Sequence, residues 1–512
     1  MRLVRARARN RNNAYVGTTI LAELARRTAE GDGQGAVRAV FAELPRNRFG
    51  SSTVIFQLFQ NAGQVDARVE QLHQQLVSLD TAVSALYYDA LLRSIVAHRA
   101  TFLEAIASVR EAHAAQPEAR PYAFSTVDLT RARDASPVVV AVWDTGVAPG
   151  LFSSQLFTNA NEQQNGADDD GNGLVDDLHG VISDPTEGQT GLTYEPGEAV
   201  LSEYSPFLRG IMDLRAGMAS TEAAQRVLAL MGQAQDAAAL DRLEMNLDAV
   251  GEWAHGTHVA GIMLAGVPEA RVAVLRSAWA GEARLYHHRG PTDEELAAER
   301  ENIEQIARFI NAHGVRVVNA SLGFGRDYVE SELRHESDRY TSDEQVRARA
   351  REVHEHRRRN WQYVFEQCPN TLFVVAAGNS SRDVVEYEDV PASLDLPNVL
   401  VVGAVDRFGD WATFTNSNPV RVRVFDHGVE VDSVIPSGER VPLSGTSMAS
   451  PNVANLATKM MSVDPSLTPQ RAIGVILATG EPIAAPFNGV VAHEERALAR
   501  VRRERPRGGR AR

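Results

Sequence analysis

Apolar runs and amphipathic segments alternate along the middle and end of the chain. Two of the amphipathic segments predict helices: residues 291–313, where Thr292 and Glu295 form a capping box, and the stretch between Thr468 and Gly480. Short, continuous apolar runs are typical of strands that are buried on both faces. We expect five such strands, near 137–143, 271–277, 315–320, 372–377 and 399–404. This alternation predicts an α/β fold, in which helices cover both faces of a parallel sheet.

The beginning of the chain follows a different pattern. From Val69 to Val109 apolar residues recur every three or four positions, which predicts one long helix or a hairpin of two helices. We therefore divide the chain into a helical amino-terminal region (1–130), an α/β domain (131–490) and an Arg-rich tail (491–512) that is expected to be disordered. The helical region could serve as a docking or regulatory module.

Two polar segments interrupt the α/β domain. Residues 182–250 contain helical patterns near 221–231 and 237–246, and residues 326–365 are dense in Arg, Glu and His, as in a solvated helix. Both are expected to be surface insertions. They either narrow the access to a cleft or have no part in it.

A loop followed by a buried helix is expected around Ser447. Gly445 permits a tight turn, and the apolar stretch 453–457 continues the helix. A Ser at a helix start has its hydroxyl at an exposed corner and its N–H at the positive end of the helix dipole, which suits a nucleophile whose product is an oxyanion. Alternatively, Ser447 only caps the helix. The choice depends on whether a base and an acid accompany it.

A base and an acid are available in two other segments. His255 is expected to open a helix beside glycines, and Asp144 ends the first predicted strand. Active groups of parallel sheets gather at the carboxyl ends of strands. We interpret the nearby His258 as a structural residue, because a zinc-binding helix usually places two His four residues apart with a Glu between them.

Three motifs, in the order Asp, His, Ser, resemble those of the subtilisin-type serine peptidases, the subtilases. They are DTGV at 144–147, HGTHVAG at 255–261 and GTSMASP at 445–451. The resemblance implies a three-layer subtilisin-like fold with a mainly parallel central sheet. It also implies that the amino-terminal region could be propeptide-like, although propeptides of this family usually mix strands with helices.

The resemblance further implies serine endopeptidase activity on polypeptide substrates. Ser447 would attack the peptide carbonyl, His255 would transfer the proton, and Asp144 would orient His255. Asn379, at the end of a predicted strand, matches the oxyanion-hole Asn of the family. Two positions after the nucleophile differ from the usual His and Gly of the family, Asn452 and Asn455. We expect this difference to alter packing and to leave the chemistry intact.

By the same resemblance, two segments form the walls of the substrate cleft. They are Ser321, Leu322 and Gly323 on one side and Ala376, Ala377 and Gly378 on the other. The alternative function is that of a catalytically silent relative that binds peptides or partners in the same cleft. An esterase is disfavoured because Gly445-Thr446-Ser447-Met448-Ala449 lacks the second Gly of the esterase motif.

An acidic loop follows the Asp motif, with the sequence DDDGNGLVDD at 168–177. Its oxygen ligands match the first half of a calcium-binding loop, and some subtilases bind calcium in a similar loop. The alternative is a solvated acidic turn. We therefore expect a structural Ca²⁺ held by a set drawn from Asp168, Asp170, Asn172, Asp176 and Asp177.

Charge and composition limit the classes of partner and the covalent cross-links that are possible. The 512 residues carry a formal charge of −14, but residues 2–11 and 494–512 each carry a net charge of +5, so the part between them carries −24. A body this acidic disfavours nucleic acid as a partner. Cys368 is the only cysteine, which excludes an intramolecular disulfide.

No apolar run is long enough to span a membrane, and the Arg-rich start is not followed by a signal-peptide core. The family resemblance favours secretion or the cell envelope, whereas the lack of a visible signal peptide leaves the cytoplasm open.

Overall fold

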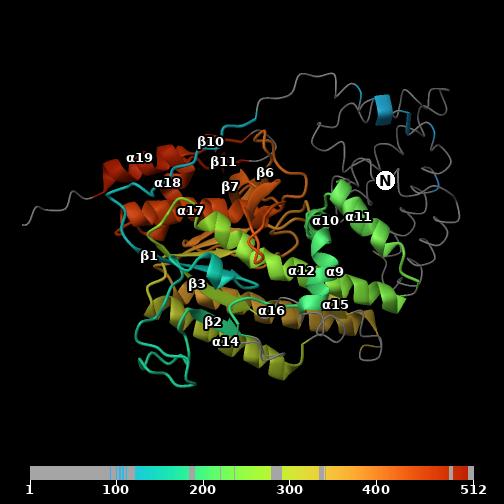
Figure 1. Ribbon diagram of the computed structural model, residues 1–512, viewed down its shortest axis with the longest axis horizontal. Helices are drawn as coiled ribbons and strands as arrows, with labels where there is room; N and C mark the ends of the chain where they lie inside the picture. Colours follow the sequence, from blue (N-terminus) through green and yellow to red (C-terminus); the bar gives the residue numbers. More distant parts are fainter. Residues whose placement is uncertain are drawn as a thin grey trace, which may run out of the picture.

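The computed structural model describes residues 121–183, 191–219, 221–235, 237–277, 291–333, 340, 342–483 and 488–505. Eight further positions between Arg93 and Glu111 are described, and all eight are helical. Most of the predicted helical region 1–130 therefore lies outside the described residues, and its boundary and role stay predictions. Figure 1 shows the described elements.

A nine-stranded sheet forms the centre of the domain, in the order β10-β11-β7-β6-β5-β4-β1-β3-β2. Every neighbouring pair is parallel except β10–β11. The five predicted strands are confirmed as β1 (Val138–Asp144), β3 (Ala270–Ser277), β4 (Val317–Ala320), β5 (Leu372–Ala376) and β6 (Val399–Val405).

Four strands of this sheet were missed, as was a separate hairpin, because these strands are short or alternate apolar and polar residues. They are β2 (Gly180–Ser183), β7 (Val422–His427), β10 (Glu481–Pro482) and β11 (Val490–Val491), with the hairpin β8 (Val431–Val434) and β9 (Arg440–Leu443).

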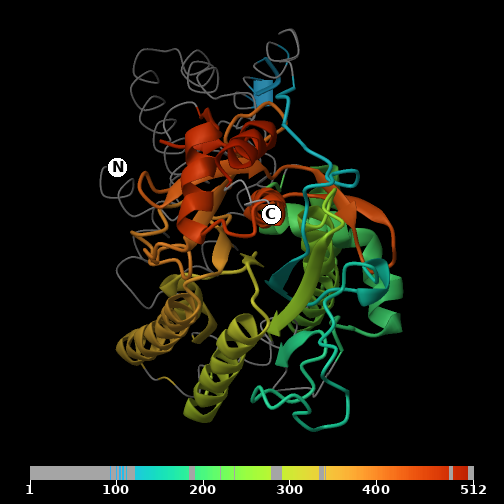
Figure 2. The ribbon, with the colours of Figure 1, turned by 90° about the vertical axis from the view of Figure 1, so that its left-hand side faces the viewer.

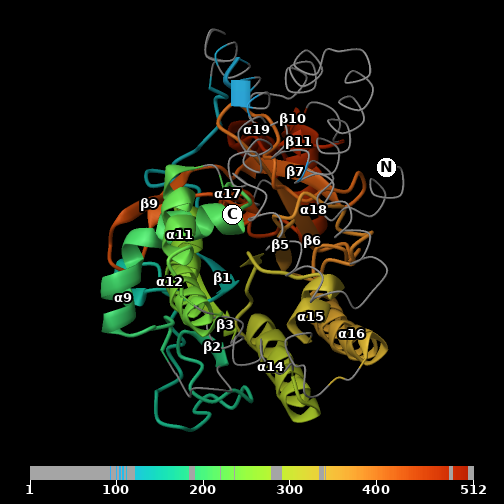
Figure 3. The ribbon, with the colours of Figure 1, turned by 90° about the vertical axis from the view of Figure 1, so that its right-hand side faces the viewer.

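Helices cover both faces of the sheet, which confirms the three-layer α/β fold. Successive residues of β1 point to opposite sides: Val140 and Val142 join one apolar core, whereas Ala141 and Trp143 join the other. The first core is covered by α12 (Ala237–Met263), α17 (Thr446–Val463), α18 (Pro469–Thr479) and α19 (Glu494–Glu504), the second mainly by α14 (Asp293–Ala312) and α16 (Asp343–Gln367). Figures 2 and 3 show the strands between α17–α19 and the pair α14 and α16.

The local signals for two helices are confirmed. Thr292 and Glu295 form both hydrogen bonds of the capping box at the start of α14. Thr468 caps α18 by accepting a hydrogen bond from the N–H of Arg471, and Gly480 follows its last residue. Short-range chemistry therefore decides where these two helices begin.

His255 does not open a helix, contrary to our expectation. It lies deep inside the 27-residue helix α12. The insertion before it supplies α9 (Glu198–Tyr204), α10 (Leu208–Arg215) and α11 (Glu222–Met231). Apolar contacts among Ile211, Val227 and Leu247 pack these helices against the first half of α12, so the helix continues upstream of the histidine.

The segment 326–365, which we expected to be a surface insertion, is more than a solvated helix. It forms α15 (Arg326–Leu333) and α16, which lie between the parallel neighbours β4 and β5 in the chain, and Val353, Trp361 and Phe365 of α16 are buried under its charged face. Trp361 packs on Trp143 of β1 with 4.1 Å between ring centroids. Figure 3 shows α15 beside α16.

The prediction of a disordered tail is wrong for the first part of that segment. Residues 494–504 form α19, because Ala497, Leu498 and Val501 recur at helical spacing and are buried in the core. Glu494 at the start of this helix pairs with the buried Lys459 of α17, with 2.9 Å between N and O. Residues 506–512 lie outside the described part.

Among the described helices, none combines the length and the apolar character that crossing a membrane requires.

Candidate active site

Asp144 ends β1 at the carboxyl edge of the sheet, and its side chain is buried. Its Oδ1 atom accepts hydrogen bonds from the backbone N–H of Thr145 (2.8 Å) and from Nδ1 of His255 (2.7 Å). Because a carboxylate can only accept, the proton of the imidazole lies on Nδ1. The two residues are 111 positions apart in the chain, and the fold brings them into direct contact.

The turn after β1 holds α12 in place at His255. The Thr145 hydroxyl accepts from the N–H of Gly256 (3.2 Å) and donates to the carbonyl of Glu252 (2.7 Å). A Cβ atom on Gly256 would stand 2.2 Å from the carbonyl oxygen of Gly146, so only glycine permits this approach. Contacts from the turn after β1 therefore hold His255 beside Asp144, although His255 lies in the interior of a helix.

The pKa of His255 reflects two opposing effects. Burial acts to lower the pKa of the imidazole, but the negative charge of Asp144 and the hydrogen bond to it outweigh that effect, and the pKa is raised above its ordinary value. An imidazole in this environment gains basicity, which is the property that a general base requires.

Ser447 is the second residue of α17, so its N–H belongs to the first turn, whose amides have no partner within the helix. Its hydroxyl donates to the carbonyl of Ser321 at 3.3 Å, a long distance for such a bond. In the described part of the chain, the Ser447 hydroxyl forms this contact and no hydrogen bond to His255. Catalytic hydrogen bonds are often long or misaligned before substrate binds, so this rotamer does not decide its role.

Ser321 also anchors the start of α17 from the other direction. Pro451 has no N–H to give to the carbonyl of Ser447 four residues earlier, and the Ser321 hydroxyl donates to that carbonyl at 2.9 Å. The hydroxyl of Ser321 also lies 2.9 Å from that of Ser450. The side chain of Ser321 therefore faces the helix, and only its backbone is left for a role in the substrate wall.

Asn379 follows β5, and its carboxamide has a defined orientation. Its Oδ1 accepts hydrogen bonds from the N–H and from the hydroxyl of Thr446, both at 2.9 Å. Because an N–H only donates, the facing atom must be the oxygen, and the NH₂ group takes the other position. That nitrogen lies 3.3 Å from where a Cβ of Gly445 would stand, next to the turn that carries Ser447.

The two predicted walls lie at the carboxyl ends of neighbouring parallel strands. Ser321, Leu322 and Gly323 follow β4, whereas Ala376 is the last residue of β5 and Ala377 and Gly378 follow it. Gly323 is exposed, and Ala377 is buried.

A family model described as "Subtilase family" matches residues 135–486, which is more than half of the chain. The chain belongs to the subtilase family. Among curated proteins, the subtilisin-like proteinase Mp1 of Magnaporthiopsis poae is 38% identical over an alignment of 138 residues, and the match covers 24% of this chain and 33% of that protein. The thermophilic serine proteinase of Bacillus sp. (strain AK1) is 30% identical over 208 residues, 41% of this chain and 42% of that protein.

Solved structures are more distant. A cold-adapted subtilisin-like serine proteinase has 20% sequence identity and a TM-score of 0.32, over 47% of this chain and 74% of that one. A lanthipeptide protease has 13% identity and a TM-score of 0.41, over 73% of this chain and 90% of that one. The chain spans less than half the length of the two curated relatives named above.

Two asparagines that depart from the usual subtilase pattern connect α17 to its surroundings. Asn455 donates from Nδ2 to the carbonyls of Met263 and Ala265, both at 2.8 Å, at the end of α12. Asn452 donates to the carbonyl of His427 at 3.0 Å. Asn455 thereby satisfies carbonyls at the end of the helix that carries His255, a role that no local pattern in the sequence indicated.

The prediction that His258 is structural agrees with its surroundings. It is fully buried, and its Nε2–H donates to the carbonyl of Val441 at 2.8 Å. Burial lowers the pKa of His258 to about 4, so the imidazole is neutral near neutral pH.

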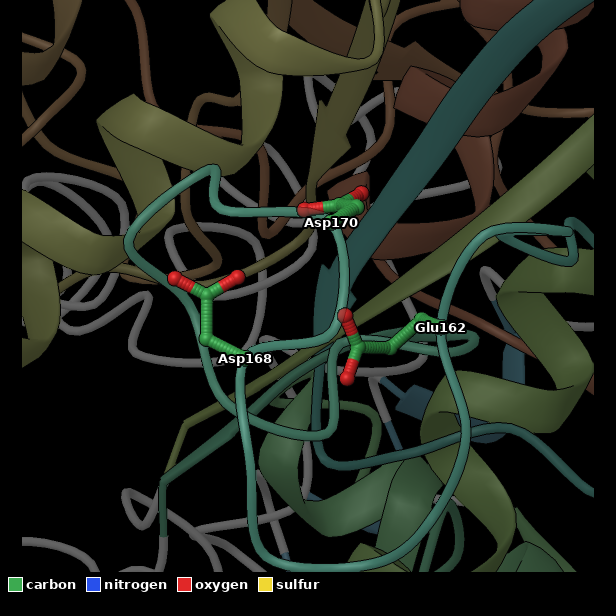
Figure 4. A group of neighbouring side chains, drawn as sticks. All are labelled: Glu162, Asp168 and Asp170. Carbon is green, nitrogen blue, oxygen red and sulfur yellow. The ribbon is translucent and has the colours of Figure 1, made fainter.

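The acidic loop gathers three carboxylates, from Glu162, Asp168 and Asp170 (Figure 4). One oxygen of each lies within 4.8 Å of the others. Glu162 was missed because it lies upstream of the recognisable motif. Its side chain is buried, and Oε2 has no hydrogen-bond partner among the described residues. An oxygen of this kind is suited to a cation.

The other predicted ligands of this loop face protein groups. Asp176 accepts from the N–H groups of Asn165 and Gly166. Asp177 accepts from Nδ2 of Asn172 (3.0 Å) and from Nε2 of His313 (2.7 Å), just after α14. Asp176 therefore closes the loop on itself, whereas Asp177 fastens the loop to the domain. Nδ2 of Asn159 donates to both Asp170 and Asp177, at 2.9 Å each, so Asp177 also supports the three-carboxylate cluster.

Proposed function

We propose that this subtilase is a serine endopeptidase that hydrolyses peptide bonds with Asp144, His255 and Ser447. The observation that supports this most directly is the buried hydrogen bond between Asp144 and Nδ1 of His255, which leaves Nε2 as the basic nitrogen. Ser447, at the start of a buried helix, lies in the GTSMASP motif, which resembles the nucleophile motif of the family.

In the proposed reaction, Nε2 of His255 takes the proton of the Ser447 hydroxyl as Oγ attacks the peptide carbonyl. This step requires the hydroxyl to rotate away from the carbonyl of Ser321. Asp144 stabilises the imidazolium that forms, and His255 then gives the proton to the leaving amine. Water hydrolyses the acyl-enzyme by the same route in reverse.

Two donors are proposed to stabilise the oxyanion: the NH₂ group of Asn379 and the N–H of Ser447. The bonds from Thr446 fix the carboxamide with its NH₂ group toward the nucleophile turn, so little reorganisation is needed during the reaction. An extended polypeptide substrate would lie between the walls 321–323 and 376–378.

We further propose that the cluster of Glu162, Asp168 and Asp170 binds a structural Ca²⁺. Three carboxylates and a buried oxygen without a donor match the ligands that calcium prefers. The ion would offset the repulsion among the carboxylates and tie the loop to the domain. Docking through the amino-terminal helices stays a prediction on residues outside the described part.

A serine-directed fluorophosphonate probe tests the proposed function. We expect it to label the wild-type chain and not Ser447→Ala, while the matched variant Ser437→Ala, at an exposed serine, is labelled like the wild type. A folded wild-type protein that neither reacts with the probe nor cleaves casein would instead favour the catalytically silent relative.

A further inference from the structure

The loop 380–390 begins directly after Asn379 and ends beside the opposite substrate wall. At its far end Val390 and Phe324 exchange two backbone hydrogen bonds, of 2.8 and 2.9 Å. Phe324 directly follows the wall residue Gly323. One loop therefore connects the proposed oxyanion residue to both walls of the cleft.

Asn416, which is buried, holds the backbone on both sides of Asn379. Its own N–H donates to the carbonyl of Gly378 at 2.8 Å. Its side-chain oxygen accepts from the N–H of Ser380 (2.8 Å) and of Arg382 (3.2 Å). These three hydrogen bonds leave the backbone at Asn379 little freedom to move.

A buried ion network continues from Asn416 to the second insertion. The Nδ2 atom of Asn416 donates to Asp389 at 2.9 Å, and Arg382 forms a two-pronged ion pair with the same carboxylate. The third arm of the guanidinium reaches Asp327 of α15 at 2.7 Å. The side chains of Arg382 and Asp389 are only 11% and 7% exposed, so this ion pair is shielded from solvent and salt, whereas Asp327 is 31% exposed.

The backbone around the network leaves room for it. A Cβ on Gly325 would stand 2.5 Å from the guanidinium and 2.6 Å from the Asp389 carboxylate. The insertion also contacts the loop at Glu388, whose carbonyl accepts from the buried His354 of α16 at 2.8 Å. Both helices of the insertion therefore contact the loop.

We propose that Asp327, Arg382, Asp389 and Asn416 are positioning residues that together form a brace for Asn379. Through this brace, the insertion 326–365 maintains the orientation of the oxyanion-stabilising carboxamide. This inference rests on the proposed function. It assigns the insertion a role in transition-state stabilisation, whereas the sequence left open whether the insertion has any role at the cleft.

Asp327→Asn tests the brace, because it keeps the size of a half-exposed side chain and removes one of the two carboxylates that face Arg382. We expect kcat on a peptide substrate to fall about fivefold, with KM within about twofold. In the Asn379→Ala background the same change should cause no further loss of kcat, because the brace acts through Asn379. The matched control is Glu355→Gln on α16, whose partners Arg358 and Arg359 are exposed.

Hydrogen exchange provides a readout that does not depend on activity. The amides of Ser380 and Arg382 should exchange about tenfold faster in Asp327→Asn and in Arg382→Lys. The second variant keeps the positive charge but cannot form the bidentate pair that the guanidinium forms with Asp389. Unchanged exchange in both variants would overturn the brace. Equal losses of kcat in the two backgrounds would overturn its action through Asn379. Failure of the wild type to react with the fluorophosphonate would remove the proposed function, and exchange would still decide whether the brace exists.

Discussion

The two sides of the proposed cleft are held in different ways. Ser447 is carried by α17, which is buried along almost its whole length and is surrounded by apolar side chains. Asn379 is carried by a loop that Arg382, Asp389 and Asn416 hold through charges and hydrogen bonds. Apolar packing is non-directional and decides where a helix lies, whereas hydrogen bonds decide how a carboxamide is oriented. Apolar packing therefore sets the position of Ser447, whereas hydrogen bonds set the orientation of the Asn379 carboxamide.

The largest effect on activity should come from removing the carboxamide of Asn379. Asn379→Ala should lower kcat by roughly 10²–10³-fold with little change in KM, a range taken from a subtilisin in which one such donor was removed. The carboxamide is expected to bind the transition state and not the ground state. Steady-state kinetics on a peptide substrate measure this. A loss that appears only in KM would contradict an oxyanion role.

A substitution in the apolar packing around α17 should lower the stability of the protein and leave its catalytic rate nearly unchanged. Leu456→Ala removes a fully buried side chain of α17 and should lower the free energy of unfolding by about 3 kcal/mol, because it leaves a cavity. Activity per folded molecule should stay within about twofold. Urea unfolding and titration of active sites with the fluorophosphonate measure the two quantities. A variant with full stability and low activity would mean that packing also sets direction.

Removal of the proposed calcium ion should act on stability. Chelation should lower the melting temperature by roughly 5 °C, and excess Ca²⁺ should restore it, since an ion that binds only the folded state stabilises that state. Glu162→Gln should remove most of this response, whereas Asp169→Asn, outside the three-carboxylate cluster, should keep it. An identical melting temperature with and without calcium would remove the metal site.

The smallest effect is a shift in pH dependence. His255 must be neutral to act as a base, and because its pKa is raised, the rate should fall on acidification through a value above 6.5. The neutral side chain of Asp144→Asn withdraws the charge that raises this pKa, so the acid limb of the remaining activity should move to lower pH. Profiles of kcat/KM against pH measure the acid limb of the wild type and of the variant. An acid limb that stays in place in the variant would mean that another group titrates.

The elements that the sequence predicts correctly are those that short segments encode. The capping box of α14, the apolar runs of β1 and β5, and the three motifs each depend on residues within a few positions of one another, and the corresponding elements are present. The predictions are wrong for segments whose structure depends on distant partners. His255 lies inside a helix because α10 and α11 pack against residues upstream of it, and part of the expected tail is α19 because α17 buries its apolar face.

The sequence did not predict that Glu162 belongs to the acidic cluster or that Asn416 supports the backbone around Asn379, for the same reason. Glu162 joins Asp168 and Asp170 only when the loop closes, and Asn416 accepts from Ser380, the residue after Asn379, from 36 positions away.

By itself, the sequence determined the family, five of the nine strands of the central sheet, and the residues proposed for catalysis, because all of these depend on local patterns. Only the tertiary structure decided which way the carboxamide of Asn379 points, which carboxylates lie together, and that the charged segment 326–365 contacts the loop after Asn379. Those outcomes depend on contacts between segments far apart in the chain, whose directions no short stretch of sequence encodes.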